Sequence, residues 1–266
     1  MANNGNGTAL ITGASTGIGA VYADRLAKQG YDLILVARNE KRLGELAAGL
    51  RRQTGRRVEV LKADLTVPAE LRHVEDVLRT DSSITVLVNN AGFGAGSKLL
   101  ESNVDDMENM IYLNVTALTR LTYAAARPFV DRKNGLIINI ASIVALAPEL
   151  LNGTYSGTKA YVVNLTQSLN RELAESGVRV QAVLPGAIKT PFWDRAGLPI
   201  KHLPSEIVMS AEELVDSSLA GLKLREVITI PSLPDIADWE AAEKARLALA
   251  PNLSRQHPAA RYAGRV

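Results

Sequence analysis

The chain has 266 residues, of which 47% are hydrophobic and 22% are charged, and its formal net charge at pH 7 is +2. This composition predicts an ordinary globular protein with a large apolar core, and the small net charge argues against nucleic acid or an anionic membrane as a partner. The chain contains no cysteine, which excludes disulfides, thiolate catalysis and thiolate-bound metal.

Short apolar runs rich in β-branched residues alternate with longer amphipathic segments, a pattern typical of βαβ units around a parallel sheet. Seven strands are predicted, approximately at Thr8–Thr12, Asp32–Ala37, Val58–Lys62, Ile84–Asn89, Leu136–Ala141, Arg179–Leu184 and Val227–Ile230. Six helices are predicted between them, at Gly17–Gln29, Glu40–Arg52, Pro68–Leu78, Val104–Val130, Tyr155–Glu175 and Ala211–Leu222. The chain is therefore predicted to be an α/β protein, with a doubly wound parallel sheet of about seven strands and helices on both faces.

The whole chain, residues 1–266, is predicted to form a single domain, because α/β folds often reach this length as one unit. Residues 1–7 are expected to be a flexible N-terminus. Residues 187–210 break the alternation with prolines while carrying apolar side chains, which predicts a substrate lid loop with an apolar underside. Residues 235–266 are expected to form a polar C-terminal helix and a tail.

A glycine-rich turn, Thr12–Gly19, follows the first strand, and the first predicted helix begins within it. Glycines let backbone N–H groups approach a phosphate, whose charge is favoured at a helix N-terminus. Although ordinary turns also use glycine, the position after an initial strand predicts a dinucleotide site and a Rossmann fold. A second glycine cluster, Gly92–Gly96, is predicted to be a loop near this site.

The second strand ends in Arg38 and carries no carboxylate there. An acidic side chain at this place binds a ribose 2′-hydroxyl, whereas arginine accommodates a 2′-phosphate. We therefore predict NADP(H) as the cofactor, with Ser15 or Arg42 assisting Arg38. A solvent-exposed arginine without a ligand is the alternative.

Tyr155 and Lys159 lie four positions apart in a predicted helix and would share one of its faces. A positive charge beside a phenol favours the phenolate, so Lys159 together with a cationic nicotinamide could lower the pKa of Tyr155 enough to make it a proton shuttle near neutral pH. Because the motif is short, a Tyr/Lys pair on a solvated helix is the alternative, and the surrounding motifs must decide.

From about residue 8 to 230 the chain resembles the short-chain dehydrogenase/reductase family. The resemblance is carried by motifs in a fixed order, namely Thr12–Gly19, Asp64, Asn89–Gly92, Asn114, Ser142, Tyr155, Lys159 and Pro185–Gly186. It implies hydride transfer between a nicotinamide cofactor and a carbonyl or alcohol. The segments Leu33–Arg38 and Ala63–Thr66 are most similar to the NADPH-preferring ketoreductase branch, which implies an apolar ketone or secondary alcohol as substrate.

The resemblance implies a catalytic set of Asn114, Ser142, Tyr155 and Lys159. Tyr155 would be the general acid in reduction and the base in oxidation, and Ser142 would hold the carbonyl oxygen. Lys159 would bind the nicotinamide ribose and lower the Tyr155 pKa. Asn114 would hold a water connected to Lys159 through a local distortion of its helix.

The implied cofactor contacts lie at the carboxyl ends of strands, where open α/β sheets bind ligands. They are Gly13, Ser15, Thr16, Gly17, Ile18, Gly19, Arg38, Asp64, Leu65, Asn90, Ala91, Gly92, Tyr155, Lys159, Pro185, Gly186, Ile188 and Thr190. The predicted walls of the substrate pocket are Phe93, Ser142, Ile143, Val144, Ala145, Leu146, Leu151, Ala187, Phe192 and Trp193.

Two other functions share these motifs. A 3-oxoacyl thioester reductase would receive an acidic carrier protein at Arg127, Arg132 and Lys133, although these charges equally suit a solvated helix end. A non-catalytic NADP-binding regulator on the same fold is the second alternative, because fold alone does not establish function.

The remaining expectations concern partners and location. Three scattered histidines have no metal-ligand spacing, so no metal is predicted. Residues 1–7 are unlike a signal peptide, and the longest apolar run, 135–151, is interrupted by polar residues and proline. We expect a cytoplasmic protein without a nucleic acid or membrane partner. The helices 104–130 and 155–175 resemble the family's oligomer faces, which predicts a homodimer or homotetramer.

Overall fold

The computed structural model of the chain describes residues 6–262. Residues 1–5 of the predicted N-terminus and 263–266 of the predicted tail lie outside the described residues. The chain divides into two compact units, residues 1–231 and 232–266. The second unit holds α9 (Ile236–Ala248) and two short 3₁₀ turns, and none of its described residues is buried. The assignment of the whole chain to a single domain stays a prediction.

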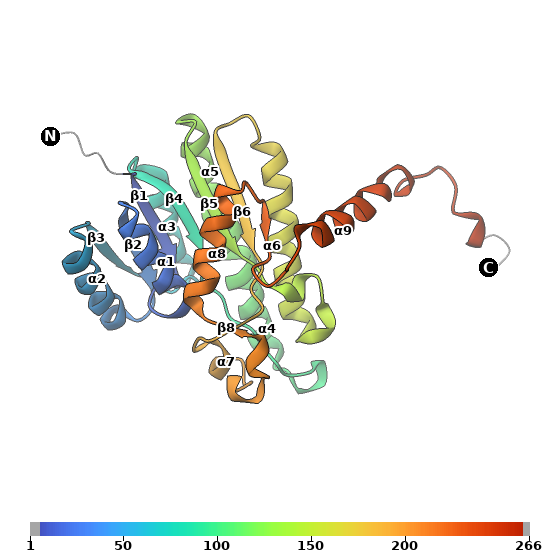
Figure 1. Ribbon diagram of the computed structural model, residues 1–266, viewed down its shortest axis with the longest axis horizontal. Helices are drawn as coiled ribbons and strands as arrows, with labels where there is room; N and C mark the ends of the chain where they lie inside the picture. Colours follow the sequence, from blue (N-terminus) through green and yellow to red (C-terminus); the bar gives the residue numbers. More distant parts are fainter. Residues whose placement is uncertain (1–5, 263–266) are drawn as a thin grey trace. The chain divides into compact units, whose positions relative to one another are not determined.

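A seven-stranded parallel sheet forms the centre of the first unit, in the order β3-β2-β1-β4-β5-β6-β9 (Figure 1). Its strands are β1 (Thr8–Thr12), β2 (Asp32–Ala37), β3 (Val58–Lys62), β4 (Ile84–Asn89), β5 (Gly135–Ile140), β6 (Val178–Val183) and β9 (Ile228–Thr229). The predicted bounds of the first four strands are confirmed, and those of the other three are correct to within one residue at each end. The predicted doubly wound fold is also confirmed.

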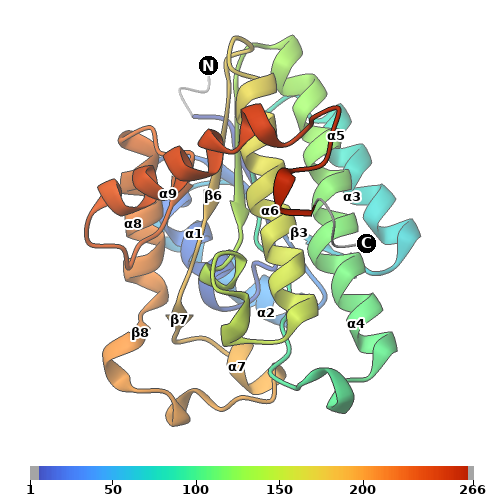
Figure 2. The same cartoon turned by 90° about the vertical axis from the view of Figure 1, so that its right-hand side faces the viewer.

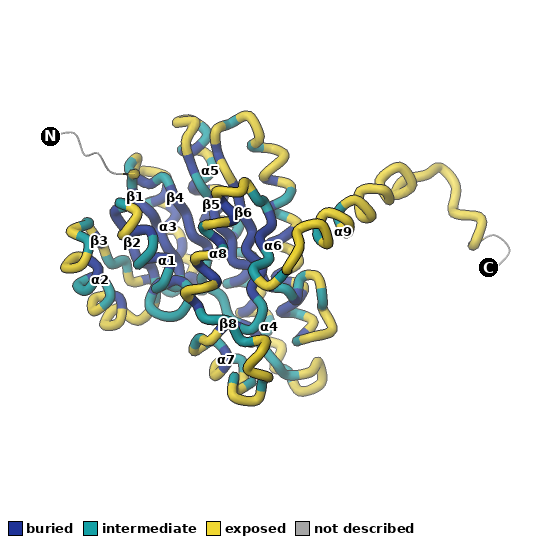
Figure 3. The backbone as a smooth tube through the Cα atoms, in the orientation of Figure 1, coloured by how far each residue is buried: buried dark blue, intermediate teal, exposed yellow. Residues whose placement is uncertain are grey.

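Helices cover both faces of this sheet. One face packs against α1 (Gly17–Lys28), α2 (Glu40–Thr54) and α8 (Ala211–Lys223). The other face packs against α3 (Pro68–Thr80), α5 (Leu118–Asp131) and α6 (Gly153–Glu172), which Figure 2 shows on one side of the sheet. Figure 3 shows the buried strands between helices whose outer faces are exposed.

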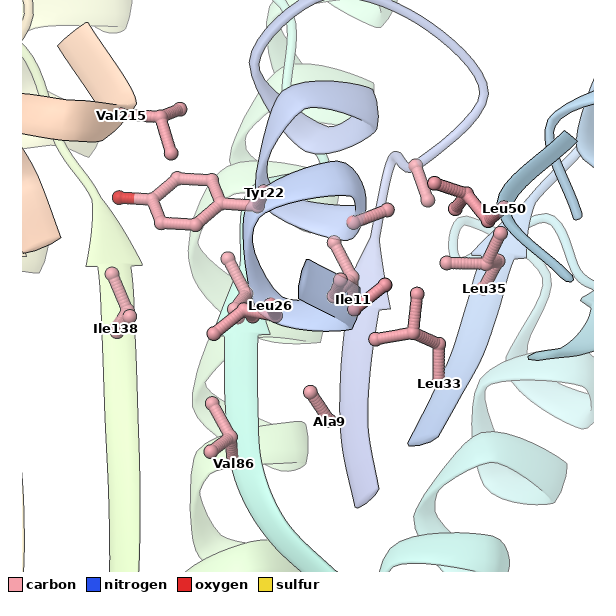
Figure 4. Packing of buried hydrophobic residues seen from close by; sticks show 14 of the residues in the cluster. Ala9, Ile11, Tyr22, Leu26, Leu33, Leu35, Leu50, Val86, Ile138 and Val215 are labelled. Atoms are coloured by element: carbon pink, nitrogen blue, oxygen red, sulfur yellow. The ribbon is translucent and has the colours of Figure 1, made fainter. Parts of the chain in front are cut away.

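The core consists of two clusters because successive side chains of a strand point to opposite faces of the sheet. In β1, Ile11 packs under α1, α2 and α8, whereas Leu10 packs under α3 and α5. Figure 4 shows the first cluster, in which the Tyr22 ring of α1 reaches toward Val215 of α8. Strands buried on both faces read as continuous apolar runs, which explains why the sequence pattern located them so well.

The order of the strands reverses between β1 and β4. From β1 the sheet continues through β2 and β3 on one side, and from β4 it continues through β5, β6 and β9 on the other. At such a point the segments that follow the two strands diverge to opposite faces and leave a crevice at the carboxyl ends. The fold therefore brings the segments after residues 12 and 89 together.

The predicted helix 104–130 is not a continuous α-helix. Its two parts, α4 (Val104–Ile111) and α5, are separated by a π-helical segment, Tyr112–Ala117. A π-helical turn inserts one residue into the helix, often at a functional site, and the spacing of apolar residues does not reveal it.

The predicted lid, residues 187–210, contains regular structure that the sequence did not predict. Its ends form two short parallel strands, β7 (Ala187–Ile188) and β8 (Val208–Met209). Between them lie α7 (Phe192–Arg195) and two 3₁₀ turns, Ile200–His202 and Ser205–Ile207. A pairing of two residues with two others is too short to leave a pattern in the sequence.

Leu10→Ala should destabilise the protein by about 2–5 kcal/mol, because it opens a cavity at a fully buried position of the central sheet. Urea unfolding of the variant and the parent measures the change. Leu100→Ala is the matched control, since that side chain is 97% exposed and its removal should cost less than about 0.5 kcal/mol. Equal unfolding midpoints for Leu10→Ala and Leu100→Ala would contradict the described core.

Candidate active site

A cavity of about 940 Å³ lies at the carboxyl ends of the central strands, beside the β1/β4 reversal. Among the predicted site residues, those that line it include Gly13, Ser15, Thr16, Gly17, Ile18, Arg38, Asp64, Leu65, Asn90, Ala91, Gly92, Ser142, Tyr155, Lys159, Pro185, Gly186, Ile188 and Thr190. Gly19 and Asn114 are not lining residues. The fold therefore gathers residues from seven segments of the chain into one site.

The turn after β1 depends on left-handed glycines. Gly13 (φ +65°) and Gly17 (φ +57°) adopt conformations that side chains rarely allow. Gly19 differs from the prediction, because it faces the turn rather than the cavity: a Cβ there would lie 2.5 Å from the Gly13 carbonyl oxygen. Its role is to let α1 pack closely against the turn.

The N-terminus of α1 is suited to an anion. In the part of the chain that the structure describes, Thr16 does not cap this helix through its side chain, and the first turn carries no acidic residue. The first amide groups of the helix therefore point toward the cavity with their partial positive charge available to a phosphate.

Asn90 and Thr12 fasten the ends of β4 and β1 together. The Asn90 side-chain amide donates to the carbonyl oxygens of Thr12 (2.9 Å) and Gly13 (3.2 Å). In return, the Thr12 hydroxyl oxygen accepts from the backbone N–H groups of Asn90 and Ala91, both at 3.0 Å. These bonds hold the glycine turn in place from the neighbouring strand.

Arg38 is a predominantly exposed side chain at the end of β2. Its Nη1 lies 3.7 Å from Asp64 Oδ2, and the Asp64 carboxylate also accepts from the backbone and hydroxyl of Thr66. Burial raises the pKa of Asp64, but the Thr66 hydrogen bonds and the Arg38 charge outweigh it and hold that pKa below its ordinary value. The guanidinium groups of Arg38 and Arg42 both line the cavity and can hold an anionic group there.

Tyr155, Ser142 and Lys159 meet where α6 passes the end of β5. Tyr155 lies in the first turn of α6, and Lys159 Nζ lies 5.8 Å from the centre of its ring, as the four-residue spacing predicts. The Ser142 hydroxyl donates to the Pro185 carbonyl (3.3 Å), and it is close enough to the Tyr155 phenol to lower the pKa of that group. Lys159 Nζ donates to the carbonyl oxygen of Ile140 at 2.8 Å. All three side chains are buried.

Burial controls the protonation of this pair. It raises the pKa of Tyr155 to about 12, with the Ser142 hydrogen bond acting in the opposite direction. It also lowers the pKa of Lys159 to about 8. In the protein alone the pKa of Tyr155 is raised, because loss of hydration is the largest influence on it. The lowering expected from Lys159 together with a cationic nicotinamide stays a prediction. At neutral pH the phenol is protonated and Lys159 is mostly charged.

Asn114 lies in the π-helical segment and is buried. Its amide accepts from the backbone N–H of Phe93 (3.2 Å) and donates to the Phe93 carbonyl (2.9 Å) and the Thr158 hydroxyl (3.1 Å). Thr158 in turn donates to the Tyr155 carbonyl at 2.7 Å. Asn114 therefore connects the segment after β4 with the turn of α6 that separates Tyr155 from Lys159.

Two residues that the sequence analysis did not assign to the site position its helix. Thr158 is one of them, and Asn152 is the other: its side chain accepts from the backbone of Thr154 (2.8 Å) and Tyr155 (3.3 Å). The Asn152 amide also donates to the Ser97 carbonyl at 2.7 Å. The helix begins at Gly153, two residues before the predicted start at Tyr155, and asparagine is a typical N-cap, so this signal could have identified Asn152 and the correct start of the helix.

Apolar side chains form much of the rest of the cavity wall, and Arg195 and His202 of the lid also line it. The predicted wall residues that line it are Phe93, Ser142, Ile143, Val144, Leu151, Ala187, Phe192 and Trp193. Ala145 and Leu146 differ from the prediction, because the 3₁₀ turn Ile143–Ala145 carries the chain away from the cavity and leaves Leu146 49% exposed. Trp193 anchors the lid, since its Nε1 donates to the Ile188 carbonyl at 2.8 Å.

The basic group proposed as a carrier-protein surface is partly engaged within the chain. Arg127 lies 3.3 Å from Asp131, and Arg132 stacks on the Phe129 ring at 5.7 Å and donates to the Ile84 carbonyl. These contacts leave less free positive charge than the sequence indicates.

Residues 6–262 also bear on other kinds of site. Within that range, no group of three or more metal-ligating side chains is arranged to hold a metal ion. Over the same residues, no helix has the length and apolar character needed to cross a membrane.

Comparison with known proteins identifies the family. The short chain dehydrogenase family model matches residues 7–198. A short-chain dehydrogenase from Sphingobium yanoikuyae, solved with NADPH, is 48% identical with a TM-score of 0.94 and covers 96% of this chain and 99% of its own. A bulky-bulky ketone specific alcohol dehydrogenase from Comamonas testosteroni is 42% identical with a TM-score of 0.89, over 97% and 98%.

An uncharacterised oxidoreductase from Staphylococcus epidermidis is 34% identical over 229 residues, which are 82% of this chain and 96% of that protein. The chain belongs to the short-chain dehydrogenase family. It is an oxidoreductase with a Rossmann fold, and the family resemblance found in the sequence is confirmed.

Lys159→Met should change how stability depends on pH. Lys159 has a pKa of about 8 in the folded protein and an ordinary value of 10.5, so between these values the unfolded chain binds more protons. Folding therefore gains stability as pH rises, by up to about 1.4 kcal/mol per pH unit, and the variant lacks this gain. Urea unfolding of both proteins from neutral pH to about pH 9.5 measures the difference. Parallel curves would contradict a buried, readily deprotonated lysine.

Proposed function

We propose that this protein is an NADP(H)-dependent carbonyl reductase/alcohol dehydrogenase with Tyr155 as the general acid and base. The observation that carries the proposal is the burial of Tyr155, Ser142 and Lys159 together on the same cavity as the glycine turn. A cavity with both features can hold a dinucleotide against the glycine turn and the reacting oxygen of a substrate against Tyr155 and Ser142.

The cradle after β1 fits a dinucleotide. Gly13 and Gly17 keep the turn free of side chains, and the amide groups of α1 favour a pyrophosphate. Arg38 and Arg42 supply positive charge for a 2′-phosphate, and Ser15 supplies a hydroxyl. The relative from Sphingobium yanoikuyae, solved with NADPH, supports the same choice of cofactor. When bound, NADPH supplies the hydride that reduces the carbonyl carbon.

Ser142 and Tyr155 orient and protonate the substrate oxygen. The two hydroxyls are neighbours, and a carbonyl oxygen between them would receive two donors once Ser142 turns its proton away from the Pro185 carbonyl. With a pKa of about 12, Tyr155 holds its proton until negative charge develops on that oxygen, and it then donates it. In alcohol oxidation the same phenol must first lose its proton, and the charge of Lys159 favours that step.

Lys159 and Asn114 complete the arrangement in different ways. Lys159, held by the Ile140 carbonyl, has further N–H donors for the hydroxyls of a nicotinamide ribose. Asn114 acts through the backbone of Phe93 and through Thr158, so it is a positioning residue for the helix turn that carries Tyr155 and Lys159. Proton relay through a water at Asn114 stays a prediction.

The substrate is an apolar ketone or secondary alcohol. Phe93, Val144, Leu151 and Phe192 line the cavity, pack around Tyr155 and offer no charge to a substrate. The specificity of the relative from Comamonas testosteroni for bulky-bulky ketones supports a ketone with large substituents. A homodimer or homotetramer and a cytoplasmic location stay predictions.

A panel of ketones tests the reaction, with consumption of NADPH followed by absorbance. Tyr155→Phe should lower turnover by at least about a hundredfold, because it removes the proton donor without changing the ring. Tyr161→Phe, one and a half turns further along α6 and hydrogen-bonded to Thr119, is the matched control and should keep its activity. Tight NADPH binding without turnover of any ketone by the parent would favour the non-catalytic regulator.

Arg38→Asp should raise the KM for NADPH by about tenfold or more and shift preference toward NADH, because a carboxylate repels a 2′-phosphate and binds a 2′-hydroxyl. Steady-state kinetics with both cofactors measure the ratio. Arg127→Asp makes the same change of charge outside the cavity and should leave the ratio unaltered. If Arg38→Asp has no effect on the ratio, Arg38 does not select the cofactor.

A further inference from the structure

The loop after β4 carries two glycines, Gly94 and Gly96, that have no part in the proposed chemistry. Among the described residues, the glycines with positive φ do not include these two. The backbone at both places is therefore open to other residues, and conformation does not explain the glycines. Their surroundings leave no space for a side chain.

Gly94 lies against the lid and the proposed catalytic tyrosine. A Cβ at this position would lie 2.6 Å from Cζ of Phe192 and 3.2 Å from Cδ2 of Tyr155. The Phe192 ring packs between neighbours, with its centre 5.9 Å from the Tyr155 ring and 5.6 Å from the Trp193 ring. The end of the Phe192 ring thus occupies the place that a side chain at position 94 would take.

Gly96 receives a second lid residue. A Cβ here would lie 2.3 Å from Cγ and Cδ1 of Leu198, which no real contact tolerates. The Gly96 backbone N–H also donates to the Ala196 carbonyl at 3.1 Å. One backbone hydrogen bond and one apolar contact therefore seat the segment after α7 on this loop.

The two glycines lie behind the lid side chains as seen from the cavity. Phe192 and Leu198 line the cavity, whereas Gly94 and Gly96 do not. Because protein interiors are close-packed, a methyl group added behind either side chain must displace it, and the free volume lies on the cavity side. Because Gly94 and Gly96 place no side-chain atoms behind Phe192 and Leu198, these two side chains can stay back from the cavity and leave room there for the substrate.

We infer that Gly94 and Gly96 are specificity-determining residues, which keep the cavity beside Tyr155 wide enough for a ketone with two bulky substituents. Gly94 sets the position of Phe192, and Gly96 sets the position of Leu198. The inference rests on the proposed function, since it concerns the width of the substrate site next to the proton donor. It explains why positions 94 and 96 of the second glycine cluster are glycines, which neither cofactor binding nor backbone conformation explains.

Gly94→Ala should lower kcat/KM for a diaryl ketone by about tenfold or more relative to that for a methyl ketone, because one added carbon in an apolar pocket discriminates on this scale. The displaced Phe192 atom is the end of a side chain, so the fold accommodates the change. Gly49→Ala is the matched control, since nothing lies within 4 Å of a Cβ there, and its ratio should equal that of the parent.

The double variant Gly94→Ala/Phe192→Leu separates the wall from the catalytic tyrosine. If the methyl group acts by moving the ring, the shorter side chain should restore the diaryl ketone ratio, which is a non-additive double-mutant cycle. Equal loss on both ketones, without rescue, would mean that Gly94 acts on Tyr155 itself and would overturn the inference.

The contact between the lid and the loop after β4 can be tested without measuring enzyme activity. Trypsin cleaves after Arg195 and Lys201, which are exposed in the lid, and mass spectrometry follows these cuts. Gly96→Ala should be cut there at least about threefold faster than the parent, because loss of the seat makes local opening easier. Equal rates would overturn the inference even if the parent reduces ketones. If Gly96→Ala is cleaved faster but the parent reduces no ketone, the proposed function would be overturned, whereas the contact of Gly96 with the lid would be supported.

Discussion

The hydrogen bonds between Asn90 and Thr12 join the two halves of the sheet at the point where its strand order reverses. Loops that leave a reversal point diverge, so the crevice they leave becomes a binding site only if its two sides are held together. Here the side chain of Asn90, which follows β4, holds the glycine turn that follows β1. The glycine turn is thus ordered before any ligand binds, and binding need not include the entropy loss of ordering it.

The same region balances burial against charge. Tyr155 and Lys159 are both removed from water, and burial favours the neutral form of each. Neighbouring polar groups hold the pair in place: Asn152 caps the helix, Thr158 links it to the π-helical segment, and the Ile140 carbonyl receives the lysine. In the proposed mechanism burial keeps the Tyr155 phenol protonated, so that it can donate its proton to a substrate oxygen. Alcohol oxidation needs the deprotonated phenol, which the positive charge of Lys159 favours.

Much of this arrangement could be predicted from the sequence, because buried strands and helical faces each leave a regular pattern of residues. Strands buried on both faces are predominantly apolar, which is why β1 and β2 were located to the residue. Tyr155 and Lys159 were paired by helical spacing alone, and the structure places them as expected. The sequence did not reveal that burial raises the pKa of Tyr155 in the protein alone, because the depth of burial depends on everything packed around the ring, and the local spacing contains none of it.

The sequence by itself determined the elements, their alternation, and the residue types that carry the chemistry, because these follow from interactions between near neighbours. Only the tertiary structure decided that Gly19 packs behind the turn, that Leu146 leaves the cavity wall, and that β7 pairs with β8. It also decided why Gly94 and Gly96 are glycines, since the side chains that fill their space come from about a hundred residues away along the chain. Contacts of that kind depend on the three-dimensional path of the chain, and a linear pattern does not record it.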